Sequence, residues 1–404
     1  MNSVLAFAIV MAVWTVSDLV AKKTKSLLSS LFVASIIFFI GFLSGIFPED
    51  LLASSSLLAL GGVAVGFIIV HLGTLISISE FKRLLKVLVI GVATVVGIGI
   101  LLYVAGFVFG GGRRQGVYDG VSQAMDYVVA GVGAISGGTI SVLIIQDAAL
   151  GVGLTSVAVF PVLIAALQGL IGFPLTSLIL RKEAARLRDE YRAGRLESPV
   201  AAAPADGEPK PGPKVPEFLT TTPGTLLLVG IVVLLSLLIN NLTGGVLNTF
   251  VVALIFGIAL RALGIFKQGI LTGIDSYGLM MLAIMILVFG PLATVEPADV
   301  AALAVPLLIA FAAGVLGIVS FSALTGKLLG YTVPMSVAIG LTSLYGFPGT
   351  MILSQEAAKG AGESPEEVAA IEGAILPKMI IAGFATVTIT SVIVTGLIAA
   401  RIGS

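Results

Sequence analysis

The sequence has no cysteine, a single histidine and few charges: only 11% of its 404 residues are Asp, Glu, Lys or Arg. Without cysteine the chain cannot form disulfides, thiolate metal sites or a thiol nucleophile. One histidine excludes a haem coordinated by two histidines of this chain. The 22 basic and 22 acidic residues balance, so composition gives no argument for nucleic acid as a partner.

Catalytic signatures are also missing. The sequence has no HExxH, no G-x-S-x-G and no P-loop. The closest approach to a P-loop, TGKLL at 325–329, lacks the upstream glycine and the hydroxyl residue after lysine. We therefore predict that the protein is not an enzyme and carries no organic cofactor.

Long apolar segments dominate what is present. Hydrophobic residues make up 57% of the chain and the mean hydropathy is +1.14, whereas a soluble domain has about a quarter of its residues charged. Apolar runs of membrane-spanning length lie at about 3–20, 28–47, 55–78, 84–109, 153–180, 223–240, 246–264, 275–294, 301–325 and 374–399. This pattern predicts an all-α integral membrane protein in a lipid bilayer.

One polar segment divides these spans into two sets of five. Residues 181–222 form a predicted cytoplasmic linker between an N-terminal transmembrane repeat, 1–180, and a C-terminal transmembrane repeat, 223–404. Each half also contains a Gly-rich apolar segment, at about 118–150 and 333–360. Because glycine and proline interrupt these two segments, we predict that each forms a re-entrant helical hairpin.

Basic residues orient the predicted spans. With both termini outside, 19 of the 22 basic residues face the cytoplasm, eight of them in the linker, and Arg113, Arg114 and Arg401 face outward. Since five is odd, the second half enters the membrane from the opposite side. We therefore predict two inverted-topology repeats, an arrangement that recurs in secondary transporters, in a cytoplasmic (inner) membrane.

A shift of 209 positions aligns parts of the two halves. It pairs Gly137 with Gly346, Ser141 with Thr350, and Gln146-Asp147-Ala148-Ala149 with Gln355-Glu356-Ala357-Ala358. Chance similarity between Ala- and Gly-rich segments is the alternative interpretation. Both copies precede the last span of their half, which favours a true repeat.

The predicted hairpin tips are ISGGTIS at 135–141 and GFPGT at 346–350. Broken backbone at membrane depth costs several kcal/mol per unpaired group unless it packs in protein or lines a polar cavity. A half-helix that starts at a tip directs its positive end toward an anion, and freed carbonyls with hydroxyls suit a hard cation such as Na⁺. The alternative is that both tips are ordinary turns at the membrane edge.

The residues at and after the tips are the candidate ligands. For the substrate they are Ser136, Gly137, Gly138, Thr139, Gly346, Pro348, Gly349 and Thr350. For the cation they are Ser141, Asp147, Thr342, Ser343, Gln355 and Glu356. The paired acids Asp147 and Glu356 could bind the coupling cation, carry a proton, or lie at the hairpin base in contact with water. His71 is interpreted as a packing residue.

The span plan, the linker and the two hairpins resemble the sodium/glutamate symporter family and the related sodium-coupled 2-hydroxycarboxylate transporters. Three stretches carry this resemblance: Ser136-Gly137-Gly138-Thr139, the segment 341–360 and the segment 67–86. The first stretch lacks the His-Gly of the family pattern. The resemblance implies a homodimer in which the outer spans of one half form a scaffold and the hairpins form a transport core.

The leading hypothesis is a secondary active transporter that couples Na⁺ to the symport of a small organic anion, a glutamate-like amino acid or a carboxylate, by alternating access. One alternative is a cation/proton antiporter, with H⁺ as the coupling ion and Asp147 or Glu356 as the titrating group. Another is the membrane subunit of a sodium-pumping decarboxylase complex, which would depend on soluble partners.

Overall fold

The computed structural model describes residues 1–404 except 77, 111–120, 137–138, 197–214, 245–246, 273, 275, 400–401 and 403–404. It does not describe the side chains of 78–84, 110, 121–125, 139–140, 155–156, 217, 385, 388–389, 392–393 and 397. Within the described residues the fold consists of helices and turns, without a strand.

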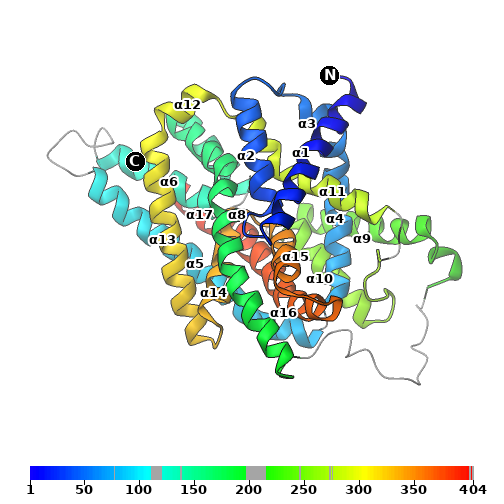
Figure 1. Cartoon of the computed structure of the whole chain (residues 1–404). Helices are drawn as coiled ribbons and strands as arrows, with labels where there is room; N and C mark the ends of the chain where they lie inside the picture. The colour runs from blue at the N-terminus through cyan, green and yellow to red at the C-terminus, as the bar shows by residue number, and fades with distance from the viewer. Residues whose placement is uncertain are drawn as a thin grey trace. The chain divides into compact units, whose positions relative to one another are not determined.

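Figure 1 shows these helices coloured in chain order. The first half contains α1 (Ser3–Lys23), α2 (Ser30–Leu43), α3 (Leu51–Ser54), α4 (Leu57–Leu75), α5 (Ile78–Gly110), α6 (Val121–Ile135), α7 (Thr139–Gly151) and α8 (Thr155–Arg192). After the short helix η1 (Glu217–Leu219), the second half contains α9 (Thr222–Leu242), α10 (Thr249–Ala262), α11 (Tyr277–Ile286), η2 (Leu287–Thr294), α12 (Pro297–Ala302) and α13 (Ala304–Leu328). The chain ends with α14 (Val333–Leu341), η3 (Thr342–Leu344), α15 (Gly349–Ala361), α16 (Pro365–Phe384), the π-helix η4 (Ala385–Thr390) and α17 (Ser391–Ala399).

Seven segments are long and apolar enough to cross a membrane, which indicates a membrane location. They lie in α1, α4, α5, α8, α9, α11 with η2, and α13. The other three predicted spans correspond to shorter or interrupted helices. α2 and α10 have 14 residues each, about 21 Å of helix against about 30 Å of hydrocarbon. The predicted span 374–399 is divided among α16, η4 and α17.

A helical membrane protein is thus confirmed in this coarse form, while the inverted repeat and the re-entrant hairpins stay predictions. The bounds of the helices do follow the predicted shift. Moved by 209 positions, α7 would cover 348–360, and α15 covers 349–361. In each half, therefore, a short helix follows a break at the corresponding place.

The described chain divides into two compact units, and each unit takes segments from both predicted repeats. The first unit comprises Met1–Val10, Asp50–Leu85 and Ala201–Gly290, and the second comprises Met11–Glu49, Lys86–Val200 and Pro291–Ser404. Both predicted hairpins belong to the second unit.

In the first unit α4 packs against α9, α10 and α11. Glycines on α4 leave room for each neighbour. The facing pairs are Gly61 and Ala283 of α11, Gly66 and Val233 of α9, and Gly73 and Leu254 of α10. Close approach at small residues is a common way for helices to associate in lipid, where van der Waals packing rather than the hydrophobic effect holds them together.

His71, the only histidine, is buried in α4 and binds the turn that precedes α11. Its Nδ1 accepts a hydrogen bond from the backbone N–H of Leu271 at 3.1 Å. One turn later, Thr74 Oγ1 accepts from the N–H of Ile270 at 3.2 Å. The imidazole also packs edge-on against the ring of Tyr277, with centroids 5.1 Å apart. These contacts agree with the interpretation of His71 as a packing residue.

In the second unit the 38-residue helix α8 is the common neighbour. α6 and α7 pack against it from the first predicted hairpin, and α14 and α15 from the second. α2 and α16 contact it as well. The breaks of both predicted hairpins are therefore positioned by the same helix.

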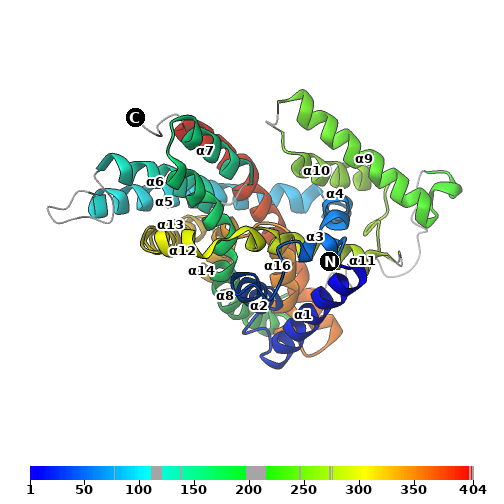
Figure 2. The ribbon, with the colours of Figure 1, turned by 90° about the horizontal axis from the view of Figure 1, so that it is seen from above.

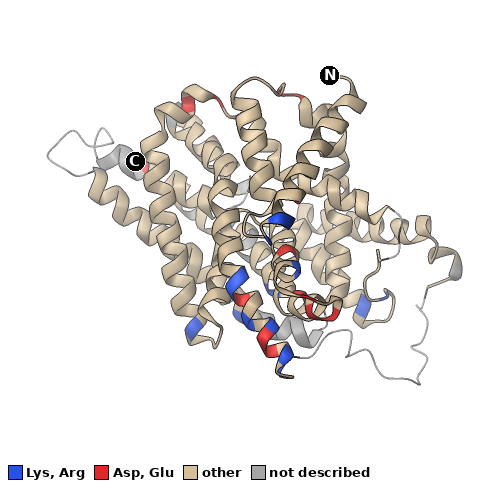
Figure 3. Ribbon diagram, in the orientation of Figure 1, with Lys and Arg blue, Asp and Glu red and all other residues tan. Residues whose placement is uncertain are grey.

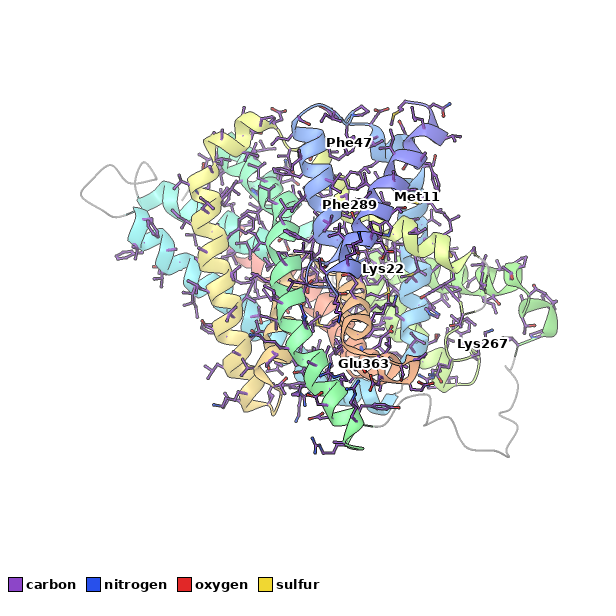
Figure 4. All side chains as sticks on the ribbon, in the orientation of Figure 1. Met11, Lys22, Phe47, Lys267, Phe289 and Glu363 are labelled. Atoms are coloured by element: carbon purple, nitrogen blue, oxygen red, sulfur yellow. The ribbon has the colours of Figure 1, made fainter. Side chains whose placement is uncertain are left out.

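Charged side chains gather near the ends of α8 and α16 (Figure 3). Arg192 Nε donates to Glu367 Oε1 at 2.7 Å, and its Nη2 lies 2.9 Å from a carboxylate oxygen of Glu363, which is labelled in Figure 4. The buried Glu183 of α8 accepts from Thr332 Oγ1, the N-cap of α14, at 2.7 Å. These bonds fix the end of α8 to the starts of α14 and α16.

Acid is expected to weaken this connection only at low pH. Hydrogen bonds from Arg192 lower the pKa of Glu367 from 4.5 to about 2. A carboxyl whose folded-state pKa is lowered stabilises the fold fully above its unfolded value, and this contribution is lost as the pH falls toward 2. Glu367→Gln should therefore lower Tm by a constant amount at neutral pH, with the gap to wild type closing below about pH 4.5.

Thermal unfolding of the purified protein across this pH range checks the prediction. The exposed Glu296 provides the control, because Glu296→Gln should change Tm little at any pH. A gap between wild type and Glu367→Gln that stays constant down to about pH 3 would contradict the assignment.

Candidate functional site

The break between α6 and α7 is held by buried hydroxyls. Ser136 Oγ donates to Val132 O at 2.7 Å and lies 2.8 Å from Ser391 Oγ. Ser141 Oγ lies 2.6 Å from the same Ser391 oxygen. All three serines are fully buried, and Thr395 Oγ1, one turn further along α17, is buried without a partner. Ser391 thus connects the two sides of the first break.

The break between α14 and α15 carries a second group of buried hydroxyls. Thr342 Oγ1 donates to Ile339 O at 2.7 Å and lies 3.3 Å from Thr386 Oγ1. Ser343 Oγ and Thr350 Oγ1 are buried and have no hydrogen-bond partner within the described structure. An unpaired buried polar group costs about 1–3 kcal/mol. Two such oxygens at one break are therefore candidates to bind a ligand.

The second break contacts a third interruption, the π-helix η4 between α16 and α17, and the first break contacts α17, which directly follows η4. Thr386 lies within η4 and Ser391 directly follows it. The two residues are five positions apart, about 7 Å along a helix axis. Figure 2 shows α7 beside α17. Because π-helical turns occur frequently at functional sites, the meeting of three interrupted helices marks this region as the candidate site.

One face of α8 supports the second break. Gln168, Gly172 and Thr176 share this face because they are four residues apart. A Cβ at Gly172 would lie 2.8 Å from Tyr345 Cδ1, so glycine lets the break approach the helix. Tyr345 Oη donates to Thr176 Oγ1 at 3.0 Å. Gln168 Oε1 is buried without a partner and adds an amide oxygen to the candidate ligands.

The predicted ligands Gly346, Pro348 and Gly349 shape the second break by packing. Gly346 has φ +57°, a conformation that favours glycine, and its Cβ would lie 3.1 Å from Val387 Cγ2. Pro348 is the N-cap of α15. A Cβ at Gly349 would lie 2.7 Å from Tyr345 Cδ2. These residues therefore let the break lie against η4 and the Tyr345 ring.

The first N–H groups of α15 have partners within the break. Thr350 N–H donates to Gly346 O at 3.0 Å, and the N–H groups of Met351 and Ile352 donate to Pro348 O at 3.1 and 3.3 Å. The positive end of α15 still favours an anion through its dipole. Direct hydrogen bonds to a ligand would come from the side-chain hydroxyls instead.

The paired acids and their neighbouring glutamine lie outside these hydroxyl groups. Asp147 is exposed on α7. Glu356 Oε1 accepts from the backbone N–H of Ser30 at 3.0 Å and from Ser30 Oγ. Gln355 Nε2 donates to Glu372 Oε1 at 3.2 Å. Within the described residues no three histidine or acidic side chains cluster as metal ligands, so a cation bound at the breaks would have hydroxyl and carbonyl ligands.

Some predicted ligands cannot be placed. Gly137 and Gly138 lie outside the described residues, as does the side chain of Thr139. The structure brings together Ser136 and Ser141 at the first break, and Thr342, Ser343 and Thr350 at the second.

Four site residues were missed by sequence reasoning: Gln168, Thr386, Ser391 and Thr395. The last three belong to the hydroxyl-rich stretch from 386 to 395, near the middle of the predicted span 374–399. Six consecutive positions there read TVTITS. Hydroxyl residues in the middle of a span were the available signal, but hydroxyls also bond to their own helix and so do not by themselves specify a site.

A further cavity in the second unit is a different kind of site. A groove of about 450 Å³ between α5 and α13 is lined only by apolar side chains, among them Leu101, Val104, Leu308 and Leu316. Such a lining suits hydrocarbon and offers no ligand to an ion.

The chain matches no protein-family model, and no curated protein matches its sequence. A functional conclusion must therefore come from the site itself.

Proposed function

We propose that the protein is a secondary active transporter that couples Na⁺ to the symport of a small organic anion. The observation that carries this proposal is the meeting of three interrupted helices at buried hydroxyls, some of which have no partner. Broken helices at membrane depth are the usual means by which secondary transporters form ion and substrate sites.

The cation is assigned to the first break. Ser391 Oγ lies 2.8 Å from Ser136 Oγ and 2.6 Å from Ser141 Oγ, and Thr395 adds a fourth hydroxyl that has no partner in the described structure. Neutral oxygen ligands suit a hard monovalent ion, and they would bind it without a buried negative charge.

The organic anion is assigned to the second break. Ser343 and Thr350 supply hydroxyls there that have no partner in the described structure and can donate to an anion, and the positive end of α15 favours a carboxylate. Thr386 and Ser391 connect the two sites through η4, so occupation of one site can change the geometry of the other. Movement of the second unit as one body would provide alternating access, and the homodimer stays a prediction.

Uptake into proteoliposomes tests the function. With an inward Na⁺ gradient, labelled glutamate, aspartate, citrate and malate would be offered separately, against a matched K⁺ gradient. We expect one of these compounds to accumulate only with Na⁺. No accumulation of any of them, in vesicles shown to hold folded protein, would contradict symport of this substrate class.

A cation/proton antiporter is the second candidate, and the enclosure of Glu356 favours it. In vesicles without any organic substrate, an antiporter would dissipate a pH gradient when Na⁺ is added. The symporter would leave that gradient intact until its substrate is present. The two assays therefore separate the candidates.

A further inference from the structure

A small enclosed cavity lies in the second unit between α8, α15 and the turn that follows α1. Its volume is about 10 Å³, enough for about one water molecule. Its polar lining comes from Lys25, Ser26, Ser177, Arg181 and Glu356. None of these residues belongs to the hydroxyl groups at the two breaks, so the cavity is a separate site.

Only one of the two carboxylate oxygens of Glu356 has a hydrogen-bond partner in the described structure. Its Oε1 accepts from the N–H and the hydroxyl of Ser30, the first residue of α2. The positive end of α2 therefore stabilises a negative charge on this carboxyl group. Its Oε2 is buried and has no hydrogen-bond partner among the residues that the structure describes. Oε1 of Glu356 thus binds the first residue of α2, and Oε2 is available to a ligand the size of a water molecule.

The turn that closes the cavity is strained. Lys25 and Ser26 both adopt left-handed backbone conformations, with φ of 49° and 57°. Such a conformation is unfavourable for a residue with a Cβ and persists only where its surroundings enforce it. A Cβ at Gly360 of α15 would lie 2.9 Å from Lys25 O, so glycine allows the turn to lie directly on α15.

The surroundings of Glu356 leave room for a water molecule and not for a coordinated metal cation. Lys25 and Arg181 line the cavity, and neither forms an ion pair with Glu356 in the described structure. Lys359 on its own helix and Asp18 on α1 act on it from further away with opposite signs, and Glu372 on α16 is bound to the adjacent Gln355. One water-sized space cannot supply the six or so oxygens that a hard cation takes.

We propose that Glu356 is a proton-binding site, separate from the Na⁺ site, that exchanges its proton through a water molecule in this cavity. Uptake forms an O–H bond at Oε2, breaks one O–H bond of a hydronium ion and leaves water behind. The neutral carboxyl group then loses its attraction to the positive end of α2. Protonation thereby loosens the contact between α2 and α15. The inference goes beyond the proposed function, because it holds whether or not the breaks bind Na⁺.

Infrared difference spectroscopy of the protein in lipid nanodiscs tests the proposal. On acidification without Na⁺, we expect a carboxylic-acid C=O band that is absent from Glu356→Gln and retained in Asp147→Asn. Asp147 is the matched control, since it holds the equivalent place in the predicted repeat but is exposed. In Ser30→Ala the band should appear at higher pH, because a donor that stabilises the charged form is gone.

Two results would overturn the proposal. One is that the Glu356→Gln variant elutes and unfolds like the wild type and still shows the carboxylic-acid band unchanged. The other is removal of the band by Na⁺ at constant pH, which would make Glu356 a cation ligand. Neither result depends on transport, so failure of this inference and failure of symport remain distinguishable.

Discussion

Replacing Ser391 with alanine is expected to weaken Na⁺ binding by about 10- to 100-fold, the equivalent of about 1–3 kcal/mol. Ser391 Oγ lies within hydrogen-bond distance of both Ser136 and Ser141. Its removal takes away one proposed ligand and leaves the other two without their shared partner. The measurement is the rise of Tm with Na⁺ concentration in purified protein, with choline as the inert salt, since a ligand that binds only the folded state raises Tm.

Matched variants separate a site effect from a packing effect. Ser141→Ala should also weaken the Na⁺ dependence more than it lowers the yield of folded protein. Ser236→Ala is the control, because Ser236 is equally buried but donates within its own helix, to Val232 O at 2.8 Å. If Ser141→Ala and Ser391→Ala both keep wild-type Na⁺ affinity, the assignment of the site is wrong.

Gly61→Ala is expected to destabilise the first unit severely, whereas Gly62→Ala should be neutral or slightly stabilising. A Cβ at Gly61 would overlap the carbonyl oxygen of Ala283 and lie 3.0 Å from its carbon, and neither backbone atom can move without shifting α11. Overpacking of this kind costs about 1–3 kcal/mol or more. A Cβ at Gly62 would meet no atom within 4 Å, and alanine favours a helix by up to about 1 kcal/mol over glycine.

These neighbouring substitutions add the same methyl group to the same helix, so the two variants have the same composition and differ only in the position of the added group. Monodispersity and Tm of each variant in detergent are the measurements. Equal behaviour of the two variants would show that α4 and α11 do not pack as the structure has them.

The helical membrane fold could be predicted because a lipid bilayer permits few backbone structures. A chain in hydrocarbon must satisfy its backbone within each segment, so apolar runs of sufficient length become helices. Seven of the predicted spans have that length and composition in the structure. The structures of the three other spans were harder to predict, since α2 and α10 are short and the last span contains η4. Hydropathy averages over a window and does not detect such interruptions.

The candidate site could be predicted in part. The breaks near Ser136 and Gly346 follow from glycine and proline, which interrupt helices through local backbone chemistry. The hydroxyls of Ser141, Thr342 and Thr350 lie close to those breaks in sequence, and so they were found. Ser391 was not, because it is 250 residues from Ser141, to which it bonds. No local pattern specifies which turn of a distant helix a break will meet.

The two acids show the same limit. Asp147 and Glu356 hold equivalent places in the predicted repeat, and the sequence offers no reason to treat them differently. In the structure Glu356 bonds to Ser30 and borders a water-sized cavity, while Asp147 is exposed. Their difference arises from which helix packs against each one.

The sequence by itself determined the helical membrane character of this protein, the two breaks near Ser136 and Gly346, and the residue types at those breaks. These depend on hydrophobicity and on local backbone preferences, both of which act within a few residues. The tertiary structure alone decided that the second break meets η4 and the first meets the start of α17, that α8 supports the second break, and that Glu356 rather than Asp147 borders a cavity. Such contacts join residues far apart in the chain, and the shape of the packed side chains selects them.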